Sequence, residues 1–174
     1  PDATVVEYHD AVSIQFDDLG LQIRNVERMR RHIELAERSP EAASAMRAFL
    51  ANVAKSHRDH SVDDLLDFMV TNDLPITPDG FVLAFKFVHR LDQPREDGAL
   101  FVDPRTQSMD NTPGTLVWMK PEQVNPNRNE TCSFGLHACA RGYLDAYRTD
   151  TILCVKIHPA HFIAVPTDYS RQKA

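Results

Sequence analysis

Two cysteines and one histidine in the segment 126–143 are the residues of this chain whose types most suggest chemistry. Cys132, His137 and Cys139 lie within eight residues of one another. Thiolate and imidazole are ligands that zinc prefers, and a cysteine beside a histidine can also act in nucleophilic catalysis. The spacing C-x4-H-x-C lacks the C-x2-C pair of most structural zinc sites, and a fourth ligand would have to be Cys154 or a distant histidine. The sequence does not identify an acidic residue that would orient His137 for catalysis.

The same segment also fits a purely structural role. From Phe134 onwards every second residue is apolar, which predicts a short strand over 134–140 with Leu136 on one face and His137 and Cys139 on the other. Small thiols that line a buried strand need no chemical function. We prefer this structural interpretation, with the zinc site and the cysteine nucleophile as alternatives.

If the segment does form a site, side chains from other parts of the chain should join it. Lys86 interrupts a strongly apolar stretch and could point into a pocket. The candidate pocket comprises Lys86, Asp110, Asn111, Arg128, Cys132, His137, Cys139 and Tyr143. We assign no catalytic role within it and expect neither a metal nor a cofactor. The chain has no phosphate-binding Walker loop, dinucleotide fingerprint or Gly-x-Ser-x-Gly elbow.

The elements that must position these residues divide the chain in two. Alternating apolar residues over 4–16 predict a β-hairpin. Helical spacing predicts three helices. The first covers 25–38, the second starts at Pro40 with Ser39 as its N-cap, and the third runs from a cap at Ser61 to about residue 72. We take residues 1–73 as this hairpin and helical region.

The second region, residues 74–174, is expected to be rich in β-structure. Strands are predicted over 81–88, 115–119, 151–157 and 161–165, and a short helix over 141–147. A long polar loop over 91–113 separates the first two strands. The predicted fold class is therefore α+β, with an N-terminal β-hairpin and helices followed by a β-rich C-terminal domain.

Composition excludes several classes of protein. The 174 residues are 43% hydrophobic and carry a net charge of −6, which argues against broad nucleic-acid binding. An arginine face at Arg24, Arg28 and Arg31 keeps a nucleic-acid module as an alternative, although neighbouring glutamates balance it. Three cysteines indicate a reducing compartment. No apolar run approaches a membrane span, and the sequence does not say whether residues precede Pro1 or follow Ala174.

Two family resemblances add to this picture. The order of elements is loosely similar to that in ADP-ribosyltransferases: a strand with Lys86, a Gly-Leu-His segment, a short helix and an apolar strand. The His or Arg motif and the Glu on the last strands that such enzymes carry are missing from this sequence. The chain resembles the bacteriophage rapid-lysis protein rIIB family more specifically, over about the last hundred residues. The matching stretches are Leu74-Pro75-Ile76-Thr77, Asp79-Gly80, Leu83-Ala84 with Lys86, Asp110-Asn111-Thr112-Pro113-Gly114, Asn127-Arg128, Thr131-Cys132-Ser133, Gly135-Leu136-His137 with Cys139, Val155-Lys156, Pro159-Ala160, Val165-Pro166 and Asp168-Tyr169.

The rIIB resemblance implies an early phage protein in the cytoplasm of the infected bacterium. It implies action with a larger rIIA-type partner, or with a host or prophage protein, and protection of the infection against exclusion by resident prophages. A location peripheral to the inner membrane, reached through a partner, and a homo-oligomer are both compatible with it. No catalytic residues are established for the family, so the resemblance favours a binding protein over an enzyme.

Overall fold

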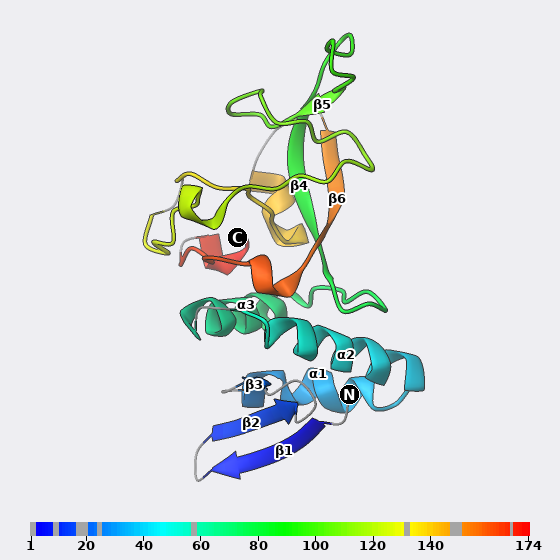
Figure 1. Cartoon of the computed structure of the whole chain (residues 1–174), viewed down its shortest axis with the longest axis vertical. Coiled ribbons are helices and arrows are strands. Elements are labelled where there is room, and N and C mark those ends of the chain that lie inside the picture. Colours follow the sequence, from blue (N-terminus) through cyan, green and yellow to red (C-terminus); the bar gives the residue numbers. More distant parts are fainter. Residues whose placement is uncertain are drawn as a thin grey trace. The chain divides into compact units, whose positions relative to one another are not determined.

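The computed structural model describes residues 3–8, 11–16, 21–23, 26–56, 59–130, 133–146, 151–167 and 169–174 (Figure 1). The chain divides into two compact units. The first contains Pro1–Leu83 and Lys156–Val165, and the second contains Ala84–Val155 and Pro166–Ala174. The boundary after residue 73 that composition suggested stays a prediction.

The first unit begins with a three-stranded antiparallel sheet in the order β1-β2-β3. Strands β1 (Ala3–Tyr8) and β2 (Ala11–Phe16) form the predicted hairpin. Strand β3 (Leu21–Ile23) was not predicted, and it places Ile23 opposite Ile14. Both isoleucines are buried, so their pairing anchors the small sheet.

Three helices follow, and local sequence signals account for their limits. A 3-10 turn, η2 (Val26–Met29), leads into α1 (Arg30–Ala36), and α2 spans Pro40–Val53. The Ser39 hydroxyl accepts a hydrogen bond from the backbone N–H of Ala42 at 3.4 Å, with Pro40 at the first helical position. The predicted cap of α2 is therefore confirmed.

Helix α3 (Asp59–Asn72) begins before the predicted cap, so that part of the prediction is wrong. Ser61 lies inside the helix and is buried. Its hydroxyl donates to the backbone carbonyl of Ile163 at 2.8 Å. The Ser61 side chain therefore bonds to a residue 102 positions away and does not cap the start of its own helix, as the sequence had suggested.

The hydrophobic core of the first unit lies on α2 and α3. The most deeply buried side chains on these two helices are Phe49, Val53, Leu65, Leu66, Phe68 and Met69. The ring of Phe68 also contacts that of Phe162, with centroids 6.1 Å apart. The returning segment 156–165 thus contributes to the same core.

The strand predicted over 161–165 does not form. A 3-10 turn, η5 (Pro159–His161), takes its place, and the His158 ring nitrogen caps it by accepting the backbone N–H of Ala160. Phe162 and Val165 are buried without strand pairing. These apolar residues of the segment are therefore buried without forming a strand.

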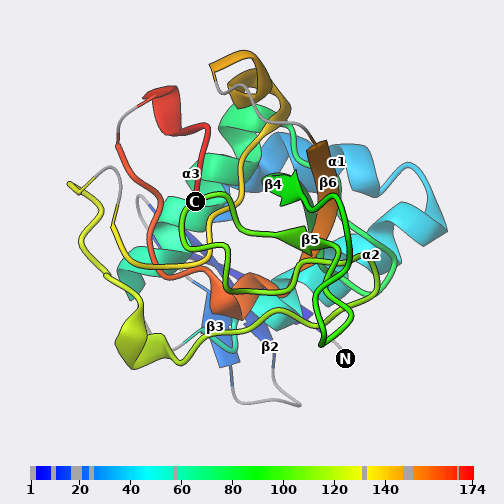
Figure 2. The same ribbon diagram turned by 90° about the horizontal axis from the view of Figure 1, so that it is seen from above.

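The second unit is built on an antiparallel β4–β5 pair and a further strand, in the order β5-β4-β6. Its strands are β4 (Val82–Arg90), β5 (Phe101–Val102) and β6 (Thr151–Ile157), and both β4 and β6 continue into the first unit. Figure 2 shows the three strands grouped together. The predictions of β4 and β6 are confirmed, and so is the α+β fold class.

Irregular segments and 3-10 turns make up the remaining described residues of the second unit. They include η3 (Pro121–Gln123), η4 (Arg141–Ala146) where a short helix was predicted, and η6 (Tyr169–Arg171). The strand predicted over 115–119 is absent from that segment, all of which the structure describes. The strand predicted over 134–140 is reduced to bridges at Cys139. Among the described residues, no helix is long and apolar enough to span a bilayer.

Candidate functional site

Cys139 lies at the centre of a short ladder in the second unit. It exchanges both backbone hydrogen bonds with Phe85 of β4, at 2.7 and 2.8 Å. On its other side it faces Lys173, and Ala138 exchanges two backbone hydrogen bonds with Ala174. Residues 138–140 are therefore held between β4 and the segment 172–174.

This ladder brings Lys86 and His137 together, because each lies close in sequence to a paired residue. The Lys86 ammonium donates a hydrogen bond to the backbone carbonyl of His137 at 3.1 Å. Lys86, His137 and Cys139, which the sequence proposed for one pocket, thus lie side by side. Whether they form a functional site stays a prediction.

The surroundings of His137 keep its ring neutral. Desolvation by the surrounding protein lowers the pKa of His137 below its usual value, and the positive charges of Lys86, Lys173 and Arg105 lower it further. The residue still presents surface to solvent. At neutral pH the imidazole can therefore donate one hydrogen bond and accept another.

Burial makes Cys139 a poor nucleophile. Only 3% of the residue is exposed. Burial raises the pKa of its thiol to about 11, and the charge of Lys86 offsets only part of that effect. The thiolate is the reactive form of cysteine, so this environment favours the structural role. Cys132 lies outside the described residues.

We expect the two described cysteines to differ sharply in reactivity. In a Cys132→Ser background, iodoacetamide at about pH 8 should modify exposed Cys154 within minutes and leave Cys139 unmodified in the folded protein. The reason is that a thiol with a pKa of about 11 is ionised in only roughly one molecule in a thousand at that pH. Peptide mass spectrometry measures both sites. Equal modification of the two cysteines in native protein would contradict the burial of Cys139.

Lys86 is half-buried and close to one carboxylate. Burial lowers the pKa of its ammonium, while Asp103 and, to a smaller extent, Cys139 raise it. Asp103 itself is occupied by its own loop. It accepts hydrogen bonds from the backbone N–H groups of residues 105, 106, 108 and 109 and from the Thr106 hydroxyl. Partial burial opposes the effect, but these bonds lower the pKa of Asp103 to about 2.

Asp110 and Asn111 shape the turn beside β5. The pKa of Asp110 is lowered by the Thr112 side chain first, and then by the backbone N–H of Thr112 at 2.8 Å and the Thr115 hydroxyl at 3.3 Å, all of which donate to its carboxylate. Asn111 is buried and donates its amide to the carbonyl of Met109. Both residues therefore have local structural partners.

Arg128 and Tyr143 lie on other segments. The Arg128 carbonyl accepts the backbone N–H of Thr167 at 3.3 Å, and the Tyr143 ring lies 6.2 Å from that of Phe87. These contacts do not join either residue to His137. Within the described part of the chain, no group of three or more His, Cys, Asp or Glu side chains could hold a metal ion.

The structure adds two basic residues that the sequence did not suggest. Arg105 lies over the Phe134 ring, 5.8 Å from its centroid, and acts electrostatically on His137. Lys173 lies near His137 because its backbone pairs with that of Cys139. No sequence signal marks either residue, because their proximity depends on contacts between distant segments.

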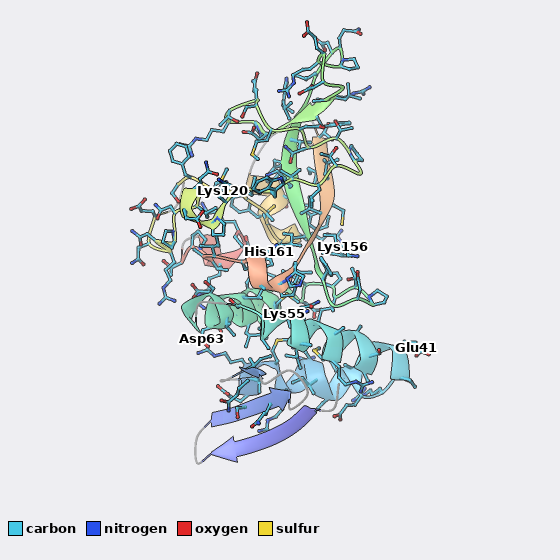
Figure 3. All side chains as sticks on the ribbon, in the orientation of Figure 1. Glu41, Lys55, Asp63, Lys120, Lys156 and His161 are labelled. Atoms are coloured by element: carbon cyan, nitrogen blue, oxygen red, sulfur yellow. The ribbon has the colours of Figure 1, made fainter. Side chains whose placement is uncertain are left out.

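Large apolar side chains are exposed on the second unit. Leu116 is 83% exposed, Trp118 is 64% exposed and Phe134 is 74% exposed. The first two belong to the segment 115–120, where the expected strand does not form; Figure 3 labels its last residue, Lys120. Within the described part of the chain, residues 116–119 form no backbone hydrogen bond to another segment. Exposed apolar groups of this size commonly mark contact surfaces.

The arginine face considered for nucleic acid is only partly described. Arg24 lies outside the described residues, and Arg31 is exposed. Arg28 forms an ion pair with Asp67 at 2.7 Å. At least one of the three arginines therefore has an intramolecular partner.

Comparison with known proteins identifies the family. A family model described as bacteriophage T4 protein rIIB matches residues 30–174. Protein rIIB of Enterobacteria phage T4 is 34% identical over 127 residues, which cover 72% of this chain and 38% of that protein. The chain thus spans about two fifths of the length of this curated relative, and no solved structure matches it. Since the family model covers most of the chain, including β4, the Cys139 ladder and Trp118, this protein belongs to the bacteriophage T4 rIIB family.

Proposed function

We propose that this rIIB-type phage protein is an accessory factor that acts by binding another protein. It works in the cytoplasm of the infected bacterium, where it protects the infection from prophage-encoded exclusion and modulates lysis. Its partner is a rIIA-type phage protein, or a host or prophage protein. Any location at the inner membrane is peripheral and comes through that partner.

The exposure of Leu116 and Trp118 is the observation that carries this proposal. Transfer of a leucine-sized or larger apolar side chain from water into an interface contributes about 2 kcal/mol. Tryptophan is also enriched among the residues that dominate binding energy at protein interfaces. Two such residues in one short segment support 115–120 as the anchor for a partner.

The environment of the cysteine and histidine favours binding over catalysis. Positive charges surround His137, whereas the histidine of a nucleophilic triad is oriented by a carboxylate. Cys139 is buried, and its raised pKa disfavours the thiolate. The described residues therefore support an architectural role for both side chains.

The proposal predicts that Leu116 and Trp118 are needed for phage growth on a restrictive host. A phage that encodes Leu116→Ser with Trp118→Ser, in an rIIB-type protein of natural length, should plate on a non-lysogenic host but fail on a host with an excluding prophage. Loss of the two side chains removes about 2 kcal/mol each, or about thirtyfold in affinity per residue. Efficiency of plating on the two hosts is the measurement.

Leu35→Ser provides the matched control, because Leu35 is 43% exposed but lies on α1 in the first unit. It should plate like the parent phage on both hosts. Immunoblots must show equal amounts of each variant. Normal plating of the double variant on the prophage-carrying host would refute a contact role for the segment.

A further inference from the structure

A half-buried histidine caps the 3-10 turn η5 in the first unit. The Nδ1 atom of His158 accepts a hydrogen bond from the backbone N–H of Ala160 at 3.2 Å. The N–H of His161 also donates to the backbone carbonyl of His158, at 3.0 Å. Because an N–H group must donate to a lone pair, Nδ1 carries no proton and the neutral ring holds its proton on Nε2. The cap therefore exists only while His158 is neutral.

The turn leads directly into residues that contact α3. The Phe162 ring lies 6.1 Å from that of Phe68, and the carbonyl of Ile163 accepts the hydroxyl of Ser61 at 2.8 Å. Both residues follow η5 without an intervening segment. A change in the conformation of η5 would therefore disturb two contacts of the first unit.

Two other basic side chains act on the His158 ring. The ring of His161, in the same turn, has its centroid 5.0 Å away. Lys55, just after α2, is held by a hydrogen bond of 2.9 Å from its ammonium to the Asn52 side chain (Figure 3). Desolvation is the largest cause that lowers the pKa of His158, and His161 and then Lys55 lower it further. A charge on this ring is therefore disfavoured.

The remaining charged groups beside this ring form an ion pair. His158 packs against the perpendicular ring of Phe81, with centroids 5.0 Å apart. The Lys156 ammonium of β6 lies over the same Phe81 ring, 4.6 Å from its centroid, and pairs with Asp79 at 2.6 Å. Among the described residues, no carboxylate opposes the lowering of the pKa of His158.

We propose that His158 makes η5 a pH-sensitive turn, which holds the segment 158–165 at neutral pH and loosens it when the ring is protonated. A proton on Nδ1 removes the acceptor, so the N–H of Ala160 loses its partner. The new positive charge also lies beside His161 and acts against that of Lys55. The turn shares no residue with the segment 115–120, so failure of this proposal would leave the proposed partner binding intact.

The direction of the effect is a loss of stability in acid. Because the folded state lowers the pKa of His158, the folded protein takes up this proton less readily than the unfolded chain. The stabilising effect of the neutral ring is therefore present above about pH 6.5, and it is lost as the pH falls through the pKa of the folded state.

Replacement of His158 by asparagine tests the cap, because an asparagine side chain can accept the same N–H but does not titrate. Urea denaturation at about pH 7.5 and about pH 5, followed by circular dichroism, gives the folding equilibrium constant at each pH. In the wild type this constant should fall about fivefold more between the two pH values than in His158→Asn, because a cap contributes about that factor. An equal fall in the two proteins would overturn the proposal.

Two further variants separate the cap from its surroundings. His161→Asn removes the neighbouring imidazole but leaves the Nδ1 acceptor of His158, so it should keep a pH dependence close to that of the wild type. His158→Phe keeps a ring beside Phe81 but offers no acceptor, so it should lose the pH dependence as His158→Asn does. Loss in His161→Asn with retention in His158→Phe would assign the effect to His161 and overturn the proposal.

NMR of the wild-type protein observes the cap without any substitution. The amide proton of Ala160 should shift along the same titration curve as the ring protons of His158, because its acceptor disappears when the ring is protonated. An Ala160 amide whose shift does not follow the titration of His158 would show that the ring does not control the turn.

Discussion

Replacement of Gly80 by alanine should destabilise the first unit by about 3 kcal/mol, roughly a 150-fold change in its folding equilibrium constant. Gly80 has φ +76°, a conformation that disfavours side chains. An added Cβ would also lie 2.3 Å from both the carbonyl carbon of Ala48 and the nitrogen of Phe49. These are backbone atoms of α2, which cannot rotate away. Urea denaturation monitored by circular dichroism measures the loss.

Gly98→Ala separates the two causes. Gly98 has φ +87°, but no atom lies within 4 Å of the position that an added Cβ would take. Its replacement should therefore cost only the backbone term, about 1 kcal/mol. Similar losses in the two variants would show that α2 does not approach Gly80 closely.

Truncation of Phe68 should have a comparable effect through a different mechanism. Phe68 is fully buried on α3 and packs against Phe162. Phe68→Ala should lower the free energy of unfolding by about 3 to 5 kcal/mol, because a large cavity replaces the ring. The same denaturation experiment measures it.

Phe134→Ala is the matched control for this change. The same residue type is removed, but the Phe134 ring is 74% exposed. Stability should change by no more than about 0.5 kcal/mol. A large loss here, or a small one at Phe68, would contradict the described core.

Local signals explain which elements could be predicted from the sequence. Ser39 followed by Pro40 specifies the start of α2 without help from distant residues. The apolar stretches of β4 and β6 likewise carry enough β-propensity to be recognised. The hairpin β1–β2 shows the same agreement between pattern and structure.

Predictions failed where an apolar pattern had another cause. Leu116 and Trp118 alternate like strand residues but are exposed, and Phe162 and Val165 are apolar because they are buried beside a 3-10 turn. Ser61 looked like a cap but serves a distant carbonyl. Alternation alone cannot separate a paired strand from an exposed or irregular segment.

The candidate site was predictable only where its residues are near in sequence or conspicuous. His137 and Cys139 are neighbours, and Lys86 stands out in an apolar strand. Arg105 and Lys173 join them through the pairing of residues 138–140 with 172–174 and through the loop after β5. Those long-range pairings leave no signature in a single sequence.

Affinity capture from infected cells tests the central claim that this protein acts by contact with another protein through residues 115–120. Tagged wild-type protein should recover a stoichiometric phage, host or prophage protein. The Leu116→Ser, Trp118→Ser variant should recover at least about thirtyfold less of it, and Leu35→Ser should recover the wild-type amount. Equal recovery by all three proteins, or the absence of any enriched protein with wild type, would contradict this claim.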